Sequence, residues 1–142
     1  MKINEAEVTL NCKAQKRDEV LKQAAFELAR RGCVDIGFSK ALLDRERETS
    51  TWLGSGIAMP HIHRRDSYRV KKSSFHILQY PDGVVWEKGR IAFLVVVVAA
   101  LDNEHLDMLA GLAGLFSDER LAHRLSVAPS REAFVTLLND AG

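Results

Sequence analysis

The sequence predicts an α/β domain in three layers, in which a β-sheet is covered by helices on both faces. Strand-like apolar segments alternate along the chain with amphipathic helical segments. The segment "IAFLVVVVAA" is apolar and β-branched at nearly every position, which is typical of a central strand with both faces buried. The 142 residues are enough for one compact domain and too few for two ordinary ones, so a single domain over residues 1–142 is expected.

The first third of the chain predicts one strand and two helices. "EVTLNC" places alternate side chains on one face of a strand, namely Val8, Leu10 and Cys12. From about Lys16 to Arg31 apolar residues recur at helical spacing, and Gly32 is a plausible stop. A second helix is expected over Phe38–Glu48, with Arg45 close to its inward face. The glycines that follow indicate a loop with short extended pieces.

Two further strands are expected in the middle of the chain. "SSFHILQY" (Ser73–Tyr80) reads as a strand, and the following Pro81-Asp82-Gly83 is a turn signal that closes it. The strongly apolar run from Ile91 to Leu101 is the predicted central strand. This run is too short to cross a bilayer.

Three helices are expected after the central strand. "NEHLDMLAGLAGLF" predicts a helix whose inward residues are Leu106, Leu109, Ala113 and Phe116. Ser117 or Asp118 starts a short helix through "ERLAHRL". Ser130 is expected to cap the last helix, "REAFVTLLND".

Composition narrows the classes of function. The formal net charge is +1, from 20 basic and 19 acidic residues, which does not favour nucleic acid as a partner. The N-terminal segment lacks the apolar core of a signal peptide, which indicates a cytoplasmic protein. Cys12 and Cys33 have no metal-site spacing and are expected to be reduced thiols, with a disulfide between them as the alternative.

The stretch "TWLGSGIAMPHIHRRD" carries two histidines, His61 and His63. On an extended chain both side chains would face the same way, which is how some zinc hydrolases begin their metal site. No further ligand cluster accompanies the pair, and Arg64 and Arg65 would repel a cation. A metal site is therefore disfavoured, and His63 is expected to be an exposed loop residue.

The "GSG" step in the same stretch is not a nucleotide-binding motif. It lacks the Lys and Ser/Thr of a phosphate loop and the third glycine of a dinucleotide fingerprint. Gly54 and Gly56 do permit a close backbone approach with exposed N–H donors near His61.

His105 follows the predicted central strand and falls in the first turn of the next helix, with Asp102 or Asn103 as its expected cap. Open α/β sheets build sites at the C-terminal ends of strands, and a helix N-terminus favours an anion. The simpler interpretation of His105 is a partly exposed surface residue. If His61, His105 and Arg45 converge, they suit phosphoryl chemistry without a metal, because neutral imidazole is a nucleophile and a guanidinium neutralises phosphate.

The segment "LLDRERETSTWLGSGIAMPH" resembles the signature of the mannitol/fructose-type enzyme IIA domains of the bacterial phosphoenolpyruvate-dependent sugar phosphotransferase system. The resemblance continues in "QYPDGVVW" and in "NEHLDML", and it covers nearly the whole chain in the family's order. The last two segments fit the mannitol branch somewhat better than the fructose branch. The family fold, a mixed sheet flanked by helices on both faces, agrees with the elements predicted above.

The resemblance implies a role for each matching residue. His61 matches the histidine that receives a phosphoryl group from phospho-HPr and passes it to a cysteine of a IIB domain. His105 matches the second active-site histidine and Arg45 the arginine of the pocket, while Thr51, Gly54 and Gly56 are weaker candidates for shaping it. No metal, nucleotide or other cofactor is implied, and contact with a membrane IIC component would come only through IIB.

The chain departs from the family pattern directly after His61. Ile62 stands where glycine is common, and His63, Arg64 and Arg65 make the following loop unusually basic. This basic rim could attract an acidic patch on a partner or could simply be solvated. A regulatory module of the nitrogen-related type, acting through phosphorylation-dependent protein binding, is the alternative to sugar transport.

Overall fold

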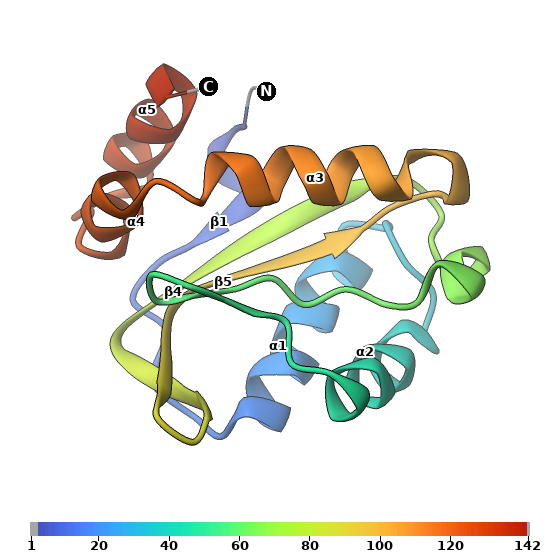
Figure 1. Ribbon diagram of the computed structural model, residues 1–142. Coiled ribbons are helices and arrows are strands. Elements are labelled where there is room, and N and C mark those ends of the chain that lie inside the picture. Colours follow the sequence, from blue (N-terminus) through green and yellow to red (C-terminus); the bar gives the residue numbers. More distant parts are fainter. Residues whose placement is uncertain (1–2, 142) are drawn as a thin grey trace.

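The computed structural model describes residues 3–141 and contains a five-stranded sheet with helices on both faces (Figure 1). The strands are β1 (Val8–Thr9), β2 (Trp52–Gly54), β3 (Ile57–Ala58), β4 (Ser74–Glu87) and β5 (Arg90–Ala99). The α-helices are α1 (Arg17–Arg30), α2 (Phe38–Glu48), α3 (His105–Leu115), α4 (Glu119–Ser126) and α5 (Arg131–Ala141). Short 3-10 helices are η1 (Glu5–Glu7), η2 (Arg64–Arg69) and η3 (Asp102–Glu104).

The sheet is mixed, with strand order β1-β4-β5-β3-β2. β1 runs parallel to β4 and β3 runs parallel to β5, whereas β4 pairs with β5 and β2 with β3 in antiparallel fashion. Because β3 and β5 are parallel neighbours, the segments that leave their carboxyl ends emerge at the same edge of the sheet. This edge receives the chain that follows Ala58 and the chain that follows Ala99.

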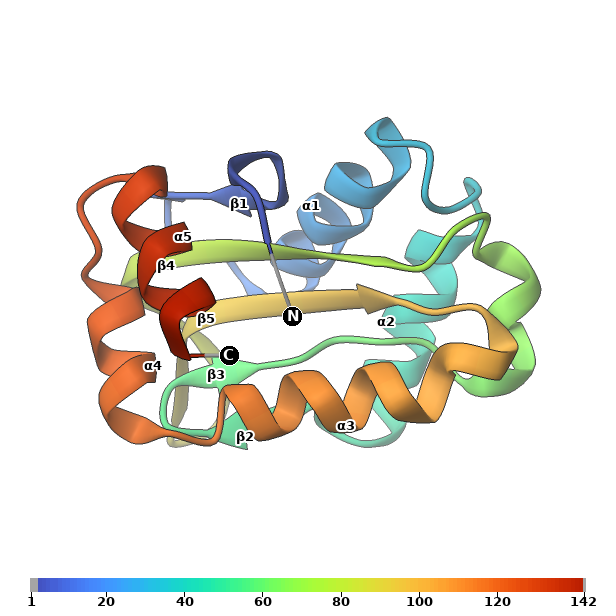
Figure 2. The ribbon, with the colours of Figure 1, turned by 90° about the horizontal axis from the view of Figure 1, so that it is seen from above.

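The central strand β5 divides the interior into two cores. Its side chains alternate, so that Val95, Val97 and Ala99 pack with α1 and α2. Leu94 and Val96 point the other way, into the core formed with α3, α4 and α5. Figures 1 and 2 show α3 and α1 lying on opposite faces of the sheet. The predicted three-layer architecture is confirmed, because each face of β5 contributes to a separate buried core.

The Pro81-Asp82-Gly83 segment does not end its strand, and the predicted turn is wrong. β4 continues through it to Glu87, and the register with β5 jumps from Gln79 to Val84. The four β4 residues between these positions oppose a single β5 residue, Phe93, so the segment forms a bulge. The reversal comes later, at Gly89, whose φ is +77°.

The other strand and helix predictions hold with smaller changes. β1 is shorter than predicted because Asn11 adopts a left-handed φ of +53°, which interrupts the extended chain. The backbone returns to the sheet at Cys12, whose N–H donates to the Gln79 carbonyl. α4 and α5 have the expected caps, since the Asp118 carboxylate and the Ser130 hydroxyl accept hydrogen bonds from backbone N–H groups in the first turn. Cys12 and Cys33 are free thiols.

Candidate functional site

His61 lies where the chain leaves β3 alongside the end of β5. The Pro60 carbonyl accepts a hydrogen bond from the Val98 N–H at 2.9 Å, which extends the pairing of β3 with β5 as far as the residue before His61. The His61 Nδ1 lies 2.8 Å from the Met59 carbonyl oxygen. A carbonyl only accepts, so Nδ1 carries the proton and Nε2 keeps a free lone pair.

His105 is brought to the same edge by the chain that leaves β5. It is the first residue of α3, and the residue is 9% exposed. The rings of His61 and His105 are 6.2 Å apart between centroids, with an interplanar angle of 69°. The interpretation of His105 as a partly exposed surface residue is therefore wrong.

The predicted cap of this helix is also wrong. The residue at the N-cap of α3 is Glu104, and no side chain caps the helix. Asp102 and Asn103 belong instead to η3, a 3-10 turn that precedes α3. The His105 N–H, the first of α3, donates to the Asp102 carbonyl, so the backbone of η3 takes the place of a side-chain cap.

Both rings are held in the neutral state around pH 7. Burial lowers the pKa of His61 below its usual value, and the charges of Arg45 and His105 lower it further, against the opposing effect of the hydrogen bond to Met59. Burial also lowers the pKa of His105, and the charge of Arg64 acts in the same direction. A neutral His61 with an available Nε2 is the nucleophilic form of imidazole.

Arg45 lies in the last turn of α2, and its Nη1 donates to the Thr49 carbonyl at 2.8 Å. This bond satisfies a carbonyl at the helix C-terminus and fixes the guanidinium at the end of α2. Arg45 uses one of its five N–H donors here. Its charge lowers the pKa of His61, so Arg45 is within electrostatic range of that ring, while the ring-to-ring distance brings His61 and His105 together.

Thr51 is buried, and its side chain does not point at the histidines. Its hydroxyl and its N–H each donate to the Glu46 carboxylate at 2.6 Å. Its carbonyl accepts from the Met59 N–H at 3.0 Å, and Met59 in turn accepts from His61. Thr51 thus connects to His61 through the backbone of Met59.

Glu46 is a residue that the sequence analysis missed. It is 3% exposed and also accepts a hydrogen bond from the Trp86 Nε1 at 3.1 Å. A signal was present in the sequence, because Glu46 continues the buried stripe of Phe38 and Leu42 at a spacing of four residues. It was hidden by the surrounding charged run, "DRERE".

Gly54 and Gly56 lie at the turn between β2 and β3 and not beside His61. The Gly56 carbonyl accepts hydrogen bonds from Phe93 and Leu94, near the start of the β3–β5 pairing. Both glycines have positive φ, of +107° and +75°, so the turn requires them. Their role is to reverse the chain into β3.

Comparison with known proteins decides the family. Residues 1–141 match the family model described as "Phosphoenolpyruvate-dependent sugar phosphotransferase system, EIIA 2". The chain belongs to this family. It is 34% identical over 134 residues to the mannitol-specific phosphotransferase enzyme IIA component of Staphylococcus aureus, covering 94% of this chain and 92% of that protein.

Two further comparisons extend this result. The chain is 34% identical to the multiphosphoryl transfer protein of Haemophilus influenzae, covering 97% of this chain and only 28% of that protein. It spans about a third or less of each multiphosphoryl transfer protein that it matches. Among solved structures, the complex of enzyme IIAMTL and phosphorylated enzyme IIBMTL from Escherichia coli matches with a TM-score of 0.91 and 33% identity, covering 98% of each chain.

The side chains of the residues after His61 point to different parts of the structure. Ile62 is buried in the core shared with α1 and α2. The His63 side chain is 27% exposed, and its Nε2 lies 2.6 Å from the Glu48 Oε2, so His63 is half-buried where the sequence predicted an exposed loop residue. The Arg64 Nε donates to the Asp102 Oδ1 at 2.9 Å, and Arg65 is exposed.

Leu106 is not an inward residue of α3, contrary to the prediction. It is 65% exposed, whereas the buried stripe of α3 runs through His105, Leu112 and Phe116 at the end of the helix. The other three residues predicted to face inward, Leu109, Ala113 and Phe116, do pack against the core, so only Leu106 was misassigned. The burial of His105 selects the face that turns it toward His61.

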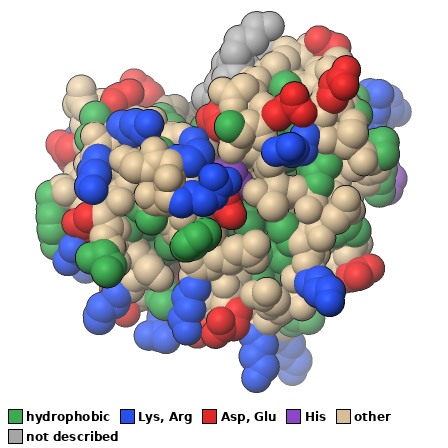
Figure 3. Space-filling model, turned by 180° about the vertical axis from the view of Figure 1, so that it is seen from behind, with side chains coloured by type: hydrophobic (Ala, Val, Ile, Leu, Met, Phe, Trp, Pro, Cys, Tyr) green, Lys and Arg blue, Asp and Glu red, His purple; other side chains and the backbone are tan. Residues whose placement is uncertain are grey.

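Across residues 3–141, no group of three or more His, Cys, Asp or Glu side chains could hold a metal ion. Nor does any helix in these residues have the length and apolarity to cross a membrane. Over the face seen in Figure 3, basic and acidic side chains are interspersed, in keeping with the small net charge.

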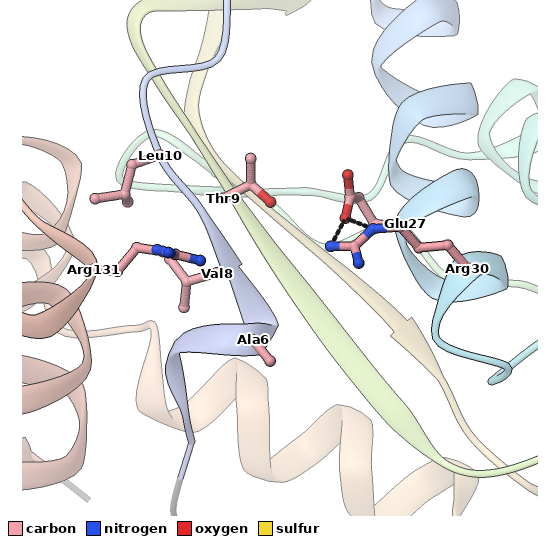
Figure 4. Close-up of a pocket in the computed structure, with 7 residues that line it drawn as sticks. All are labelled: Ala6, Val8, Thr9, Leu10, Glu27, Arg30 and Arg131. Atoms are coloured by element: carbon pink, nitrogen blue, oxygen red, sulfur yellow. Dashed lines mark hydrogen bonds and ion pairs between the residues drawn. The ribbon is translucent and has the colours of Figure 1, made fainter.

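A cavity of about 690 Å³ opens between α1, β1 and α5 (Figure 4). There Arg30 pairs with Glu27 on α1, while Arg131 reaches toward β1 from the side of α5. None of the predicted site residues lines this cavity. The site around His61 lies instead where the chain leaves β3 and β5.

Proposed function

We propose that this chain is a phosphoryl carrier of the sugar phosphotransferase system. His61 accepts a phosphoryl group from phospho-HPr and passes it to a cysteine of a IIB domain that serves mannitol/fructose-type uptake. The observation that supports this most directly is the His61 ring itself. Its Nδ1–H is fixed by the Met59 carbonyl, and its Nε2 is free at an edge shared with His105.

In the first step the Nε2 lone pair of His61 attacks the phosphorus of the donor's phosphohistidine. The new N–P bond forms as the donor's N–P bond breaks, and the electron pair of that bond returns to the donor imidazole. The Met59 carbonyl stabilises the positive charge that spreads over the phosphorylated ring through its bond to Nδ1–H. His61 enters this step as neutral imidazole, with its Nε2 unprotonated, because burial lowers its pKa.

In the second step a cysteine thiolate of IIB attacks the same phosphorus. An S–P bond forms, the N–P bond to His61 breaks, and neutral imidazole is restored. His105 orients the phosphoryl group by hydrogen bonding, and the Arg45 guanidinium neutralises part of its charge as it transfers. These roles use only side chains of the chain and its partners, with no metal, nucleotide or other cofactor.

The partners follow from the same proposal. The donor is HPr, the acceptor is a IIB domain, and contact with a membrane IIC component occurs only through IIB. The Escherichia coli complex supports a IIB acceptor, since there enzyme IIAMTL is bound to phosphorylated enzyme IIBMTL. We place the protein in the cytoplasm and treat residues 1–142 as a single EIIA type-2 domain.

The proposal is tested by incubating the protein with phosphoenolpyruvate, enzyme I and HPr and measuring its mass. One acid-labile, alkali-stable phosphoryl group is expected on the wild type and none on His61→Ala. His123→Ala is the matched control, because it removes an exposed histidine on α4 and should still accept the group. Phosphorylation of His61→Ala, or none of the wild type, contradicts the proposal.

The identity of the acceptor separates transport from the regulatory alternative. Phosphorylated protein is mixed with a purified cognate IIB domain and with a variant whose active cysteine is replaced by serine. Transfer to the cysteine form alone supports the transport role. Phosphorylation that is stable toward IIB but changes binding to another protein supports the regulatory role.

A further inference from the structure

We propose that His63 and Arg64 are positioning residues that set the spacing of the three groups at the site. This inference rests on the proposed function and adds two residues to it. The segment His61–Arg64 holds the nucleophile and also bonds to the two elements that carry Arg45 and His105. The residues directly after His61 would thereby act as a two-sided clamp.

The first side of the clamp reaches α2. The His63 Nε2 and Glu48 Oε2 are 2.6 Å apart, and Glu48 is the last residue of that helix. Arg45 lies one turn earlier on α2 and donates to Thr49, the residue after Glu48. A shift of this helix end relative to His63 would therefore move the Arg45 guanidinium relative to His61.

The second side reaches the segment that leads into α3. The Arg64 Nε donates to the Asp102 Oδ1 at 2.9 Å, and Asp102 is the first residue of η3. η3 runs directly into His105, the first residue of α3. The other end of the same turn is held separately, because the Ser73 hydroxyl donates to the Glu104 carboxylate at 3.0 Å.

A buried residue between His61 and His63 fixes the backbone from which the two bonded side chains extend. Ile62 is 3% exposed and packs in the core under α1 and α2, so the backbone between His61 and His63 cannot shift freely. η2 begins at Arg64, with His63 at its N-cap. The two bonded side chains thus start from a rigid piece of chain.

The clamp is expected to affect geometry more than stability. The side chains of Glu48 and Asp102 are 54% and 67% exposed, and exposed pairs of this kind contribute at most about 1 kcal/mol to folding. Transfer rates are more sensitive, because a displacement of a reacting group by about 1 Å can slow a reaction by about 10²-fold. If His63 and Arg64 acted only through their charge, they would change the attraction of the partner protein and not the maximal transfer rate.

Two double-mutant cycles test this: His63→Ala with Glu48→Ala, and Arg64→Ala with Asp102→Ala. Single-turnover transfer from phospho-HPr is measured as a function of donor concentration. Each single variant should lower the maximal rate by about threefold to thirtyfold with little change in the concentration at half-maximal rate. Each double variant should be no slower than its singles, and the melting temperature should move by less than about 4 °C.

Arg65→Ala is the matched control, because it removes an exposed positive charge next to Arg64 that has no carboxylate partner among the ion pairs of residues 3–141. It should leave the maximal rate unchanged. Equal effects of Arg64→Ala and Arg65→Ala, confined to the concentration dependence, overturn the clamp in favour of partner attraction. Additive effects within a cycle, or an Asp102→Ala variant as fast as wild type, overturn it as well.

A second readout does not depend on phosphoryl transfer. The imidazole resonances of His61 and His105 are recorded by NMR in the unphosphorylated protein. Both should shift or broaden in His63→Ala and Arg64→Ala and stay in place in Arg65→Ala. Unchanged resonances in all three variants overturn the clamp even if the wild type accepts no phosphate, and failure of wild-type phosphorylation alone bears only on the proposed function.

Discussion

Glu46 accepts two hydrogen bonds from Thr51, each 2.6 Å long, one from the hydroxyl and one from the backbone N–H. Through Thr51 this buried carboxylate connects to Met59 and then to His61, so the end of α2 and the nucleophile share one hydrogen-bonded path. The carboxylate also accepts from Trp86, which leaves it fully paired within the core.

Removal of this carboxylate should destabilise the protein strongly. Glu46→Ala leaves the buried donors of Thr51 and Trp86 without partners, and we expect a loss of about 3 to 5 kcal/mol of unfolding free energy. Glu46→Gln should lose less, about 1 to 2 kcal/mol, because the amide can still pair with all three groups. Urea unfolding measures both, and Glu48→Ala, at an exposed carboxylate on the same helix, should change stability by less than about 1 kcal/mol.

The face of α3 that packs on the sheet can be tested with two leucines of the same helix. Leu112 is 1% exposed and Leu106 is 65% exposed. Leu112→Ala should lower the unfolding free energy by about 2 to 5 kcal/mol, whereas Leu106→Ala should change it by less than about 0.5 kcal/mol. Similar losses at both positions in chemical denaturation would contradict the observed orientation of the helix.

The charge of Arg45 should be visible in the titration of His61. Burial is the main cause of its lowered pKa, and the Arg45 guanidinium adds to the effect. Arg45→Gln should therefore raise the pKa of His61 toward its ordinary value, as followed by NMR of the ring protons. The pH below which His61 stops accepting phosphate should rise in parallel. Arg47→Gln, on the same helix, is the control, and an equal rise there would point to general charge instead of proximity.

His76 should make the fold sensitive to acid. It is fully buried between β4 and α1, where burial and the charges of Arg31 and Arg30 lower its pKa to about 4. The folded state therefore keeps it neutral while the unfolded chain takes up a proton below pH 6.5. Its contribution to stability is complete above that pH and is lost as the pH falls toward 4, by about 3 kcal/mol at most.

The control for this acid sensitivity is His76→Gln, which cannot titrate. Above pH 7 the unfolding free energies of wild type and variant should differ by a constant amount. Between pH 6.5 and 4 the wild type should lose stability relative to the variant. Parallel pH profiles would show that the acid sensitivity arises from other groups. His61 and His105 remain in both proteins, so their titration cancels in the comparison.

Much of the fold was predictable because it follows from local periodicity and burial. The unbroken apolar run of β5 required cover on both faces, and the helical spacing over Phe38–Glu48 matches α2 at both ends. Predictions failed where a local signal competed with long-range pairing. Pro81-Asp82-Gly83 would be a turn in isolation, but the pairing of β4 with β5 on both sides absorbs it as a bulge.

The candidate site was predictable only through resemblance to a family, since periodicity alone could not show that His61, His105 and Arg45 meet. Glu46 escaped notice because a buried carboxylate is indistinguishable from its exposed neighbours in a charged run. The bonds of His63 and Arg64 escaped notice because their partners come from distant parts of the chain.

The sequence by itself determined the layers of this protein and the chemical groups available for phosphoryl transfer. Burial on both faces of β5 demands an apolar run from Leu94 to Ala99, and imidazole and guanidinium carry their chemistry wherever they lie. Only the tertiary structure decided which groups meet. The parallel pairing of β3 with β5 delivers His61 and His105 to one edge of the sheet, because neighbouring parallel strands end on the same side.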